Sequence, residues 1–156
     1  EIISHNQDDY PLLLGVLRGC HPFLSDLSRE LMIMGMDHMI DYIGVSSYHG
    51  GTKSNGAPSI YHEPTLSVDN ATVIVVDDIV DSGRTAQLVT NYCLQYGASS
   101  VQYATLINKP SKHEVDVTVD YWGFQCDGQF VVGYGLDYLE GMRGLPVILT
   151  AREIEA

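Results

Sequence analysis

The sequence predicts an α/β fold with a mainly parallel central sheet flanked by helices. Residues 73–76 form an unbroken β-branched run, which is typical of a strand buried on both faces of a parallel sheet. Further apolar runs alternate with segments of helical periodicity up to about Ile107. A chain of 156 residues can bury a substantial core. We therefore expect a single domain, residues 1–156, with its core at about 10–110.

The first half of the chain contains two strand candidates around one helix candidate. Residues 1–10 read as the end of a helix, so we expect a preceding segment to be missing. Pro11–Leu17 is an apolar run that ends in a turn at Arg18-Gly19, and an amphipathic segment then runs to Gly35. Ile40–Ser46 is the next strand candidate. The polar stretch 47–64 follows, and its glycines and prolines predict a lid or binding loop.

The second half repeats this alternation before it becomes irregular. Amphipathic residues follow the 81–85 turn, and Gly97 ends that helix candidate. Val101–Ile107 is another strand candidate, with Lys109 just beyond it. Three shorter apolar runs complete the chain, at Tyr121–Phe124, Phe130–Tyr134 and Leu145–Leu149.

The turn at residues 81–85 (Asp-Ser-Gly-Arg-Thr) has the composition of a phosphate site. Backbone N–H groups at the start of a helix lack internal partners, and together with the helix dipole they favour an anion. The hydroxyls of Ser82 and Thr85 can add donors, and Gly83 can adopt a positive φ. Asp77 and Asp78 directly follow the β-branched run, at the expected carboxyl end of its strand, and carry acceptor-only groups suited to sugar hydroxyls or Mg²⁺. The alternative is that this acidic turn only caps a helix.

Composition restricts the possible partners. The net charge of −12 disfavours nucleic-acid binding, which depends on contacts to phosphates. No apolar run reaches membrane-spanning length and no signal peptide opens the chain, so we expect a cytoplasmic protein without a membrane partner. The three cysteines form no C-x-x-C pair and are expected to be reduced.

The string VIVVDDIVDSGRT resembles the phosphoribosyl-pyrophosphate (PRPP) motif of type I phosphoribosyltransferases. GVLRG, VSSY, LINKP, DYWGF and FVVGYGLDY, followed by R-x-L-P, are similar to hypoxanthine-guanine phosphoribosyltransferases of the bacterial type. This resemblance implies the type I phosphoribosyltransferase fold, with a small hood over the base site. It implies Mg²⁺-dependent transfer of the 5-phosphoribosyl group from PRPP to N9 of hypoxanthine or guanine, in a homodimer or homotetramer.

The resemblance also implies which residues bind PRPP. Residues 81–85 would hold the 5′-phosphate, and Asp77 and Asp78 the ribose hydroxyls or their metal ion. Arg143 and the Arg18-Gly19 turn would contact pyrophosphate, and Asp137 would bind a second Mg²⁺. The Leu17–Arg18 peptide bond is cis in the family, and Ser47 and Tyr48 would open the loop that closes over the site. The nucleotide-binding set is therefore Leu17, Arg18, Gly19, Ser47, Tyr48, Asp77, Asp78, Asp81, Ser82, Gly83, Arg84 and Thr85.

For the purine, the resemblance implies that Asp81 is the general base toward the N7 proton. Lys109 would donate to the 6-oxo group, Phe130 would stack on the ring, and the backbone of Val131 would meet its edge. The catalytic set is Asp81, Lys109 and Arg143, and the purine-binding set is Lys109, Phe130, Val131 and Asp137.

Two departures from the family pattern leave alternatives open. The usual F-x-I-P-[DE]-x-F reads FQCDGQF at residues 124–130, without the proline, and Arg18 stands where lysine is commoner. The ranking of hypoxanthine, guanine and xanthine therefore stays open. A xanthine-preferring enzyme, a non-catalytic nucleotide-binding regulator and an inactive paralogue are the alternatives.

Overall fold

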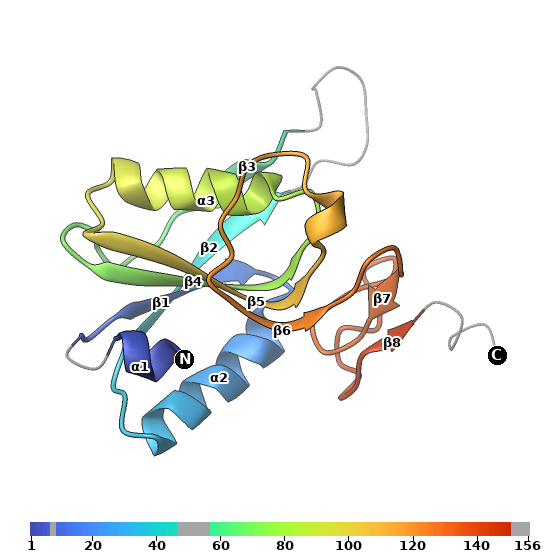
Figure 1. The fold of residues 1–156 in the computed structure, drawn as a ribbon, viewed down its shortest axis with the longest axis horizontal. Coiled ribbons are helices and arrows are strands. Elements are labelled where there is room, and N and C mark those ends of the chain that lie inside the picture. The colour runs from blue at the N-terminus through green and yellow to red at the C-terminus, as the bar shows by residue number, and fades with distance from the viewer. Residues whose placement is uncertain (7–8, 47–56, 151–156) are drawn as a thin grey trace.

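The computed structural model describes residues 1–6, 9–46 and 57–150. Its helices and strands alternate along most of the chain (Figure 1). They are α1 (Ile2–His5), β1 (Leu12–Leu17), α2 (His21–Ile33), β2 (Met39–Ser46), β3 (Ser59–His62), β4 (Thr72–Val80), α3 (Arg84–Gln95), β5 (Ser100–Asn108), the 3₁₀ turn η1 (Pro110–Lys112), β6 (Tyr121–Gln125), β7 (Val131–Val132) and β8 (Leu149–Thr150).

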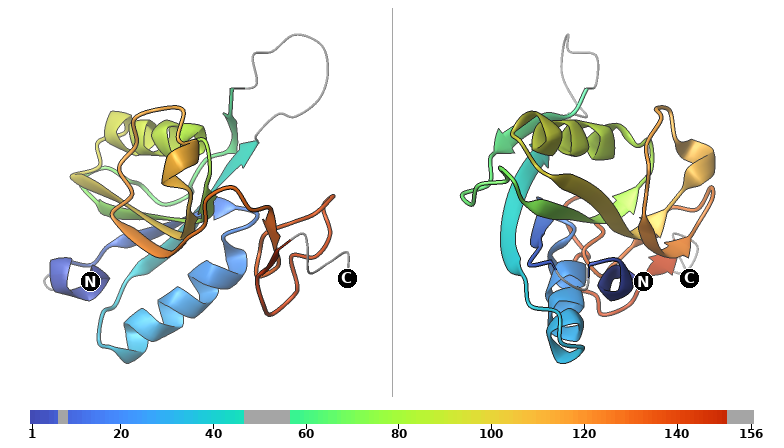
Figure 2. Two further views of the ribbon diagram at one scale, coloured as in Figure 1. Left: turned by 45° about the vertical axis from the view of Figure 1, so that its right-hand side comes forward. Right: turned by 60° about the vertical axis from the view of Figure 1, so that its left-hand side comes forward.

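The central sheet has six strands in the order β3-β2-β1-β4-β5-β6. Adjacent strands in this sheet pair in parallel, except at the β3 edge, where β2 and β3 are antiparallel. Helices α2 and α3 cover opposite faces (Figures 1 and 2). The predicted α/β fold with a mainly parallel sheet is confirmed.

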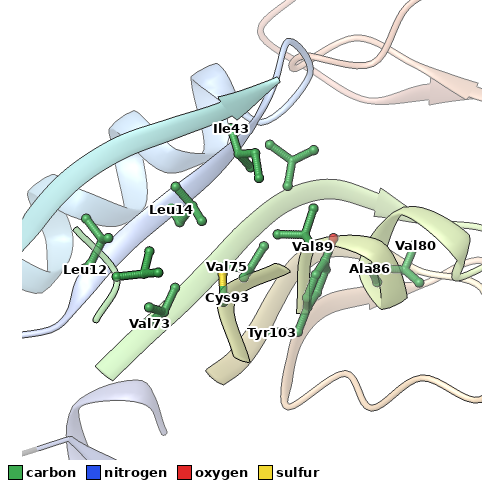
Figure 3. Packing of buried hydrophobic residues seen from close by; sticks show 12 residues of the cluster. Leu12, Leu14, Ile43, Val73, Val75, Val80, Ala86, Val89, Cys93 and Tyr103 are labelled. Atoms are coloured by element: carbon green, nitrogen blue, oxygen red, sulfur yellow. The ribbon is translucent and has the colours of Figure 1, made fainter. Parts of the chain in front are cut away.

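Strand β4 forms the centre of both apolar layers because its side chains alternate between the faces. Val73 and Val75 pack with Val89 of α3 in one cluster, which Figure 3 shows from close by. Ile74 and Val76 pack with Leu24 of α2 in the other. A strand that is apolar on both faces is expected at the centre of a two-sided parallel sheet.

The structure corrects three boundaries expected from the sequence. Strand β4 extends to Val80, so Asp77 and Asp78 lie inside the strand rather than beyond its end. Ser59–His62, within the stretch expected to be a loop, forms the edge strand β3 through backbone pairing with β2. The runs at 130–134 and 145–149 yield only the two-residue strands β7 and β8, because this segment turns sharply at several positive-φ residues.

Asp41 of β2 fastens the chain that follows β3. Its carboxylate accepts hydrogen bonds from the backbone N–H groups of Tyr42, Thr65 and Leu66 and from the Thr65 hydroxyl, at 2.7–3.0 Å. Burial alone would raise the pKa of the Asp41 carboxyl, but these hydrogen bonds outweigh it and hold the pKa below its usual value. The ionised carboxylate is therefore a structural anchor.

Replacing Asp41 by asparagine is expected to lower the free energy of unfolding by about 2 kcal/mol, because an amide cannot accept all these hydrogen bonds. The wild-type contribution is fully present above the unfolded-state pKa of about 4 and is lost as the pH falls through the lower folded-state pKa. Urea unfolding between pH 3 and 7 measures both effects. Glu63→Gln, an exposed charge-matched change, should have little effect. Equal stability of the two variants would contradict the anchoring role.

No helix in the described part of the chain is long and apolar enough to cross a membrane. The three cysteines are free thiols, and Cys20 and Cys93 are buried.

Candidate active site

The predicted site residues gather at the carboxyl ends of three adjacent strands. Strand β4 lies between β1 and β5, so the ends of these strands meet at one edge of the sheet. Arg18-Gly19 follows β1, the 81–85 turn follows β4, and Lys109 follows β5. This edge is where parallel α/β sheets bind their ligands.

The 81–85 turn connects β4 directly to α3. Gly83 precedes the helix with φ of 81°, and a Cβ at this position would lie only 2.8 Å from a methyl carbon of Val117. Glycine is therefore required both by the backbone conformation and by this contact. The Ser82 carbonyl accepts the N–H of Glu114 at 2.9 Å, and the Arg84 side chain pairs with the Glu114 carboxylate at 2.8 Å. These contacts hold the N–H groups at the start of α3 in a fixed turn.

Asp81 and Lys109 form an ion pair across the ends of β4 and β5. The Lys109 Nζ lies 3.0 Å from Asp81 Oδ2. The Lys109 side chain is 8% exposed, whereas the Asp81 side chain is 55% exposed. The Lys109 N–H also donates to the Val80 carbonyl at 3.0 Å, which continues the pairing of the two strands. A buried cation and an accessible carboxylate are thus available at one point, as acid–base chemistry on a heterocycle needs.

The acidic pair Asp77 and Asp78 is mostly buried. Asp77 is only 5% exposed and accepts a 2.7 Å hydrogen bond from the Tyr103 hydroxyl. Burial raises the pKa of both carboxyls, and the charge of Asp78 raises that of Asp77 further. A cation or a hydroxyl donor brought to Asp78 would offset this cost. The pair therefore favours a cation or a hydroxyl donor as a further partner.

Gly19 packs closely against the Asp78 carboxylate. A Cβ at Gly19 would overlap the Asp78 carboxylate, and a Cβ at Gly135 would overlap the Gly19 carbonyl. The Arg18-Gly19 turn is thus enclosed by β4 on one side and by the segment after β7 on the other. The cis peptide bond Leu17–Arg18 implied by the resemblance is present.

Two arginines converge beside this turn. Arg143 pairs with Asp137 at 2.9 Å and donates to the Gly135 carbonyl at 2.8 Å. The Glu140 carboxylate lies 2.9 Å from the Arg18 guanidinium and 3.5 Å from that of Arg143. Glu140 therefore bridges two cations from segments far apart in the sequence.

The segment that carries Phe130 extends beyond the sheet. The Phe130 ring is half exposed and meets Tyr138 edge-on, with centroids 5.9 Å apart. Val131 is buried in β7. Residues 124–130, which depart from the family pattern, contain Asp127. Its carboxylate accepts a 2.6 Å hydrogen bond from the Ser111 hydroxyl, which keeps the pKa of Asp127 below its usual value. This contact links the segment before Phe130 to the turn after Lys109.

Magnesium ligands were predicted at Asp77, Asp78 and Asp137. Within residues 1–6, 9–46 and 57–150, no group of three or more His, Cys, Asp or Glu side chains could hold a metal ion by itself. Mg²⁺ is often held by only one or two carboxylates together with substrate phosphates. The pair Asp77–Asp78 fits that mode because it supplies two carboxyls side by side, and the donors that hold them, two backbone N–H groups and the Tyr103 hydroxyl, are neutral.

Most of the predicted residues therefore come together, with some exceptions. Ser47 and Tyr48 lie outside the described residues. A pocket of about 810 Å³ between α2 and β5–β8 includes Val131 but neither Lys109 nor Phe130 in its lining.

Sequence reasoning missed Tyr103, Glu140 and Glu114. Tyr103 stands in an apolar strand and gave no polar signal, and the two glutamates contact residues far away in the chain.

The geometry can be compared with known proteins. The model of the phosphoribosyl transferase domain family matches residues 1–139. This chain belongs to that family. The phosphoribosyltransferase is 40% identical to the hypoxanthine-guanine phosphoribosyltransferase of Streptococcus mutans over 144 residues, which cover 92% of this chain and 78% of that protein.

Solved structures of similar proteins share its fold. A hypoxanthine phosphoribosyltransferase from Staphylococcus aureus superimposes with a TM-score of 0.86 at 34% identity, covering 99% of this chain and 83% of that one. The hypoxanthine phosphoribosyltransferase of Trypanosoma cruzi, in complex with the product IMP, gives a TM-score of 0.83 at 29% identity, covering 92% and 75%. The phosphoribosyltransferase is thus similar to hypoxanthine-guanine enzymes in sequence and in fold.

Proposed function

We propose that this phosphoribosyltransferase transfers the 5-phosphoribosyl group from PRPP to N9 of hypoxanthine or guanine in purine salvage, giving IMP or GMP and pyrophosphate. The observation that carries the proposal is the Asp81–Lys109 ion pair beside the phosphate turn. It combines a proton acceptor and a proton donor where the base must meet the sugar. The relatives reported above carry the names of enzymes with this activity.

The phosphate turn and the acidic pair account for the binding of the sugar. The 5′-phosphate would accept hydrogen bonds from the N–H groups of residues 81–85 and from the hydroxyls of Ser82 and Thr85. The ribose hydroxyls would donate to the acidic pair, whose buried charge favours such donors. Both groups belong to β4 and the turn that follows it, so their separation is fixed by one strand.

The ion pair accounts for the choice of base. Lys109 can only donate, so it would bind the 6-oxo group of hypoxanthine or guanine and would disfavour adenine, whose 6-amino group is itself a donor. Asp81 would accept the N7 proton. Phe130, half exposed, would stack on the purine, and the Val131 backbone would meet its edge.

Cations are needed where the leaving group departs. Breaking the C1–O bond places positive charge on the ribose and negative charge on pyrophosphate. Arg18, Arg143 and the Gly19 N–H would stabilise pyrophosphate in a protein that is otherwise strongly acidic. Mg²⁺, held by Asp77 or Asp78 and by Asp137 together with substrate oxygens, would supply further charge neutralisation. Ser47 and Tyr48 remain the predicted start of a covering loop that would exclude water.

Glu140 occupies the position of an anion between Arg18 and Arg143. Because the incoming pyrophosphate group must displace this carboxylate, Glu140→Gln is expected to tighten pyrophosphate binding by about three- to tenfold, the worth of an exposed ion pair in a small network. Isothermal titration with Mg-pyrophosphate measures the change. Glu63→Gln, at an exposed glutamate just after β3, is the matched control. Weaker pyrophosphate binding by Glu140→Gln would show that Glu140 helps rather than competes.

Product identification tests the proposed function. The protein is incubated with PRPP, MgCl₂ and hypoxanthine or guanine, and the nucleotides are separated by chromatography. We expect IMP or GMP and an equal amount of pyrophosphate, with no product when Mg²⁺ is chelated. Binding of nucleotide without any product would instead favour the regulatory relative. Homo-oligomer formation, which the resemblance implies, and a cytoplasmic location, which the hydropathy pattern of the sequence predicts, stay predictions.

A further inference from the structure

Tyr103 lies in the interior of the sheet next to the acidic pair. It belongs to β5, is 1% exposed, and stands opposite Val75 in the register with β4. Its ring packs in the apolar cluster beside Val89 of α3 (Figure 3). A tyrosine needs a partner for its hydroxyl when it is buried this deeply. That partner is a residue of the active site.

The Tyr103 hydroxyl donates to Asp77 Oδ2 at 2.7 Å. The other oxygen of the same carboxylate, Oδ1, accepts the Asp78 N–H at 2.9 Å. Both oxygens of Asp77 are thus held, one from a neighbouring strand and one from the next residue. Two contacts on different oxygens fix both the position and the rotation of a carboxyl group.

The orientation of Asp77 bears directly on Asp78. The Asp78 carboxylate accepts the Ile79 N–H at 3.0 Å and fills the space beside Gly19. There is no room for it to move toward Gly19. The Asp78 N–H is one of the two donors that hold Asp77, so rotation of the Asp77 carboxyl would break a contact between the two acidic residues. A fixed Asp77 therefore helps to keep the two carboxyls in one arrangement.

We propose that Tyr103 is a positioning residue for PRPP binding, which acts by holding the Asp77 carboxyl so that the acidic pair presents one fixed set of oxygens to the ribose. This inference rests on the proposed function, because it assigns the acidic pair to the sugar of PRPP. Tyr103 itself touches no substrate. Its role is that of an outer hydrogen-bond partner, and the loss of such a partner behind a metal ligand typically costs about 10–100-fold in affinity or activity.

The test removes one oxygen atom. Tyr103→Phe keeps the ring and its packing but deletes the donor to Asp77. Tyr121→Phe is the matched control. Tyr121 lies on the neighbouring strand β6, and the change deletes a hydroxyl that donates to Gln102 of β5 at 2.9 Å. For wild type and both variants, titration calorimetry gives the dissociation constant of Mg-PRPP. Steady-state kinetics at saturating PRPP gives the KM for hypoxanthine.

We expect Tyr103→Phe to weaken PRPP binding about tenfold or more, while its KM for hypoxanthine stays within about twofold of wild type. In Tyr121→Phe, both constants should stay within about twofold of wild type. The hydroxyl acts only through Asp77, so the same change made in an Asp77→Ala background should alter PRPP binding less than about twofold. The non-additivity shows that the hydroxyl acts through Asp77. The unchanged hypoxanthine KM separates positioning from a general disturbance of the site, which would weaken the binding of both substrates.

Two results would overturn the inference: unchanged PRPP binding in Tyr103→Phe, or an undiminished loss in the Asp77→Ala background. Because the readout is equilibrium binding, it does not depend on turnover. A wild-type protein that binds PRPP but transfers it to no purine would end the proposed function, while the binding comparison would still decide the role of Tyr103. A wild-type protein that fails to bind PRPP would end both.

Discussion

Asp81→Asn is expected to reduce kcat by about 10²–10⁴-fold, the usual contribution of a general base. The Asp81 side chain is 55% exposed and is held by Lys109 at 3.0 Å, so it is both accessible to the purine and oriented. Asparagine keeps the shape and can still accept a hydrogen bond from Lys109, but it cannot take the N7 proton. Stopped-flow or steady-state assays with hypoxanthine measure the loss.

The Asp81→Asn variant should still bind Mg-PRPP within about threefold of wild type, because the phosphate turn depends on backbone N–H groups. Asp116→Asn, at an exposed residue of the loop between η1 and β6, controls for the altered net charge. Turnover of Asp81→Asn within a few-fold of wild type would remove Asp81 from the role of base. A parallel loss of PRPP binding would instead assign it to the sugar phosphate.

Lys109→Met is expected to raise the KM for hypoxanthine by about 10–100-fold, which is the value of a hydrogen bond from a charged donor. The Lys109 side chain is buried and its amino group pairs with Asp81, so methionine preserves the packing of the aliphatic part of the side chain while it removes the charge. The PRPP dissociation constant should change much less. Competition binding with IMP and with PRPP separates the two effects.

Lys112→Met tests whether any lysine in this segment matters, because Lys112 ends the turn η1 and is exposed. It should leave both constants near their wild-type values. If Lys109→Met weakened PRPP and hypoxanthine equally, Lys109 would be a structural lysine that supports the end of β5. The preference for 6-oxopurines would then need another explanation.

The sequence allowed the core of this site to be predicted because its parts are local. The phosphate turn depends on a strand, a glycine and a helix start that are contiguous at residues 73–97. The Arg18-Gly19 turn and Lys109 could also be predicted, since each directly follows an apolar strand. Residues at the carboxyl ends of parallel strands meet by geometry alone.

Contacts between distant segments could not be predicted in the same way. Glu140 meets Arg18 across 122 positions, and nothing in GLDYLEG indicates that the chain turns back there. The turn depends on positive φ at Leu139 and Glu140, which residue preferences disfavour. Tyr103 stands in an apolar strand, where aromatic side chains are common, so its sequence gives no sign of the contact with Asp77. The strand that contains Asp77 and Asp78 is longer than its β-branched run indicates, since acidic residues are rare in strands.

The purine selectivity of the enzyme is the most direct test of the roles proposed for Asp81 and Lys109. The measurement is kcat/KM for hypoxanthine, guanine, xanthine and adenine, by absorbance, with PRPP and Mg²⁺ saturating. We expect turnover of hypoxanthine or guanine and none of adenine, because in the proposed roles Lys109 would donate to a 6-oxo group and Asp81 would accept from N7. Turnover of adenine at a comparable kcat/KM would contradict the role given to the Asp81–Lys109 pair.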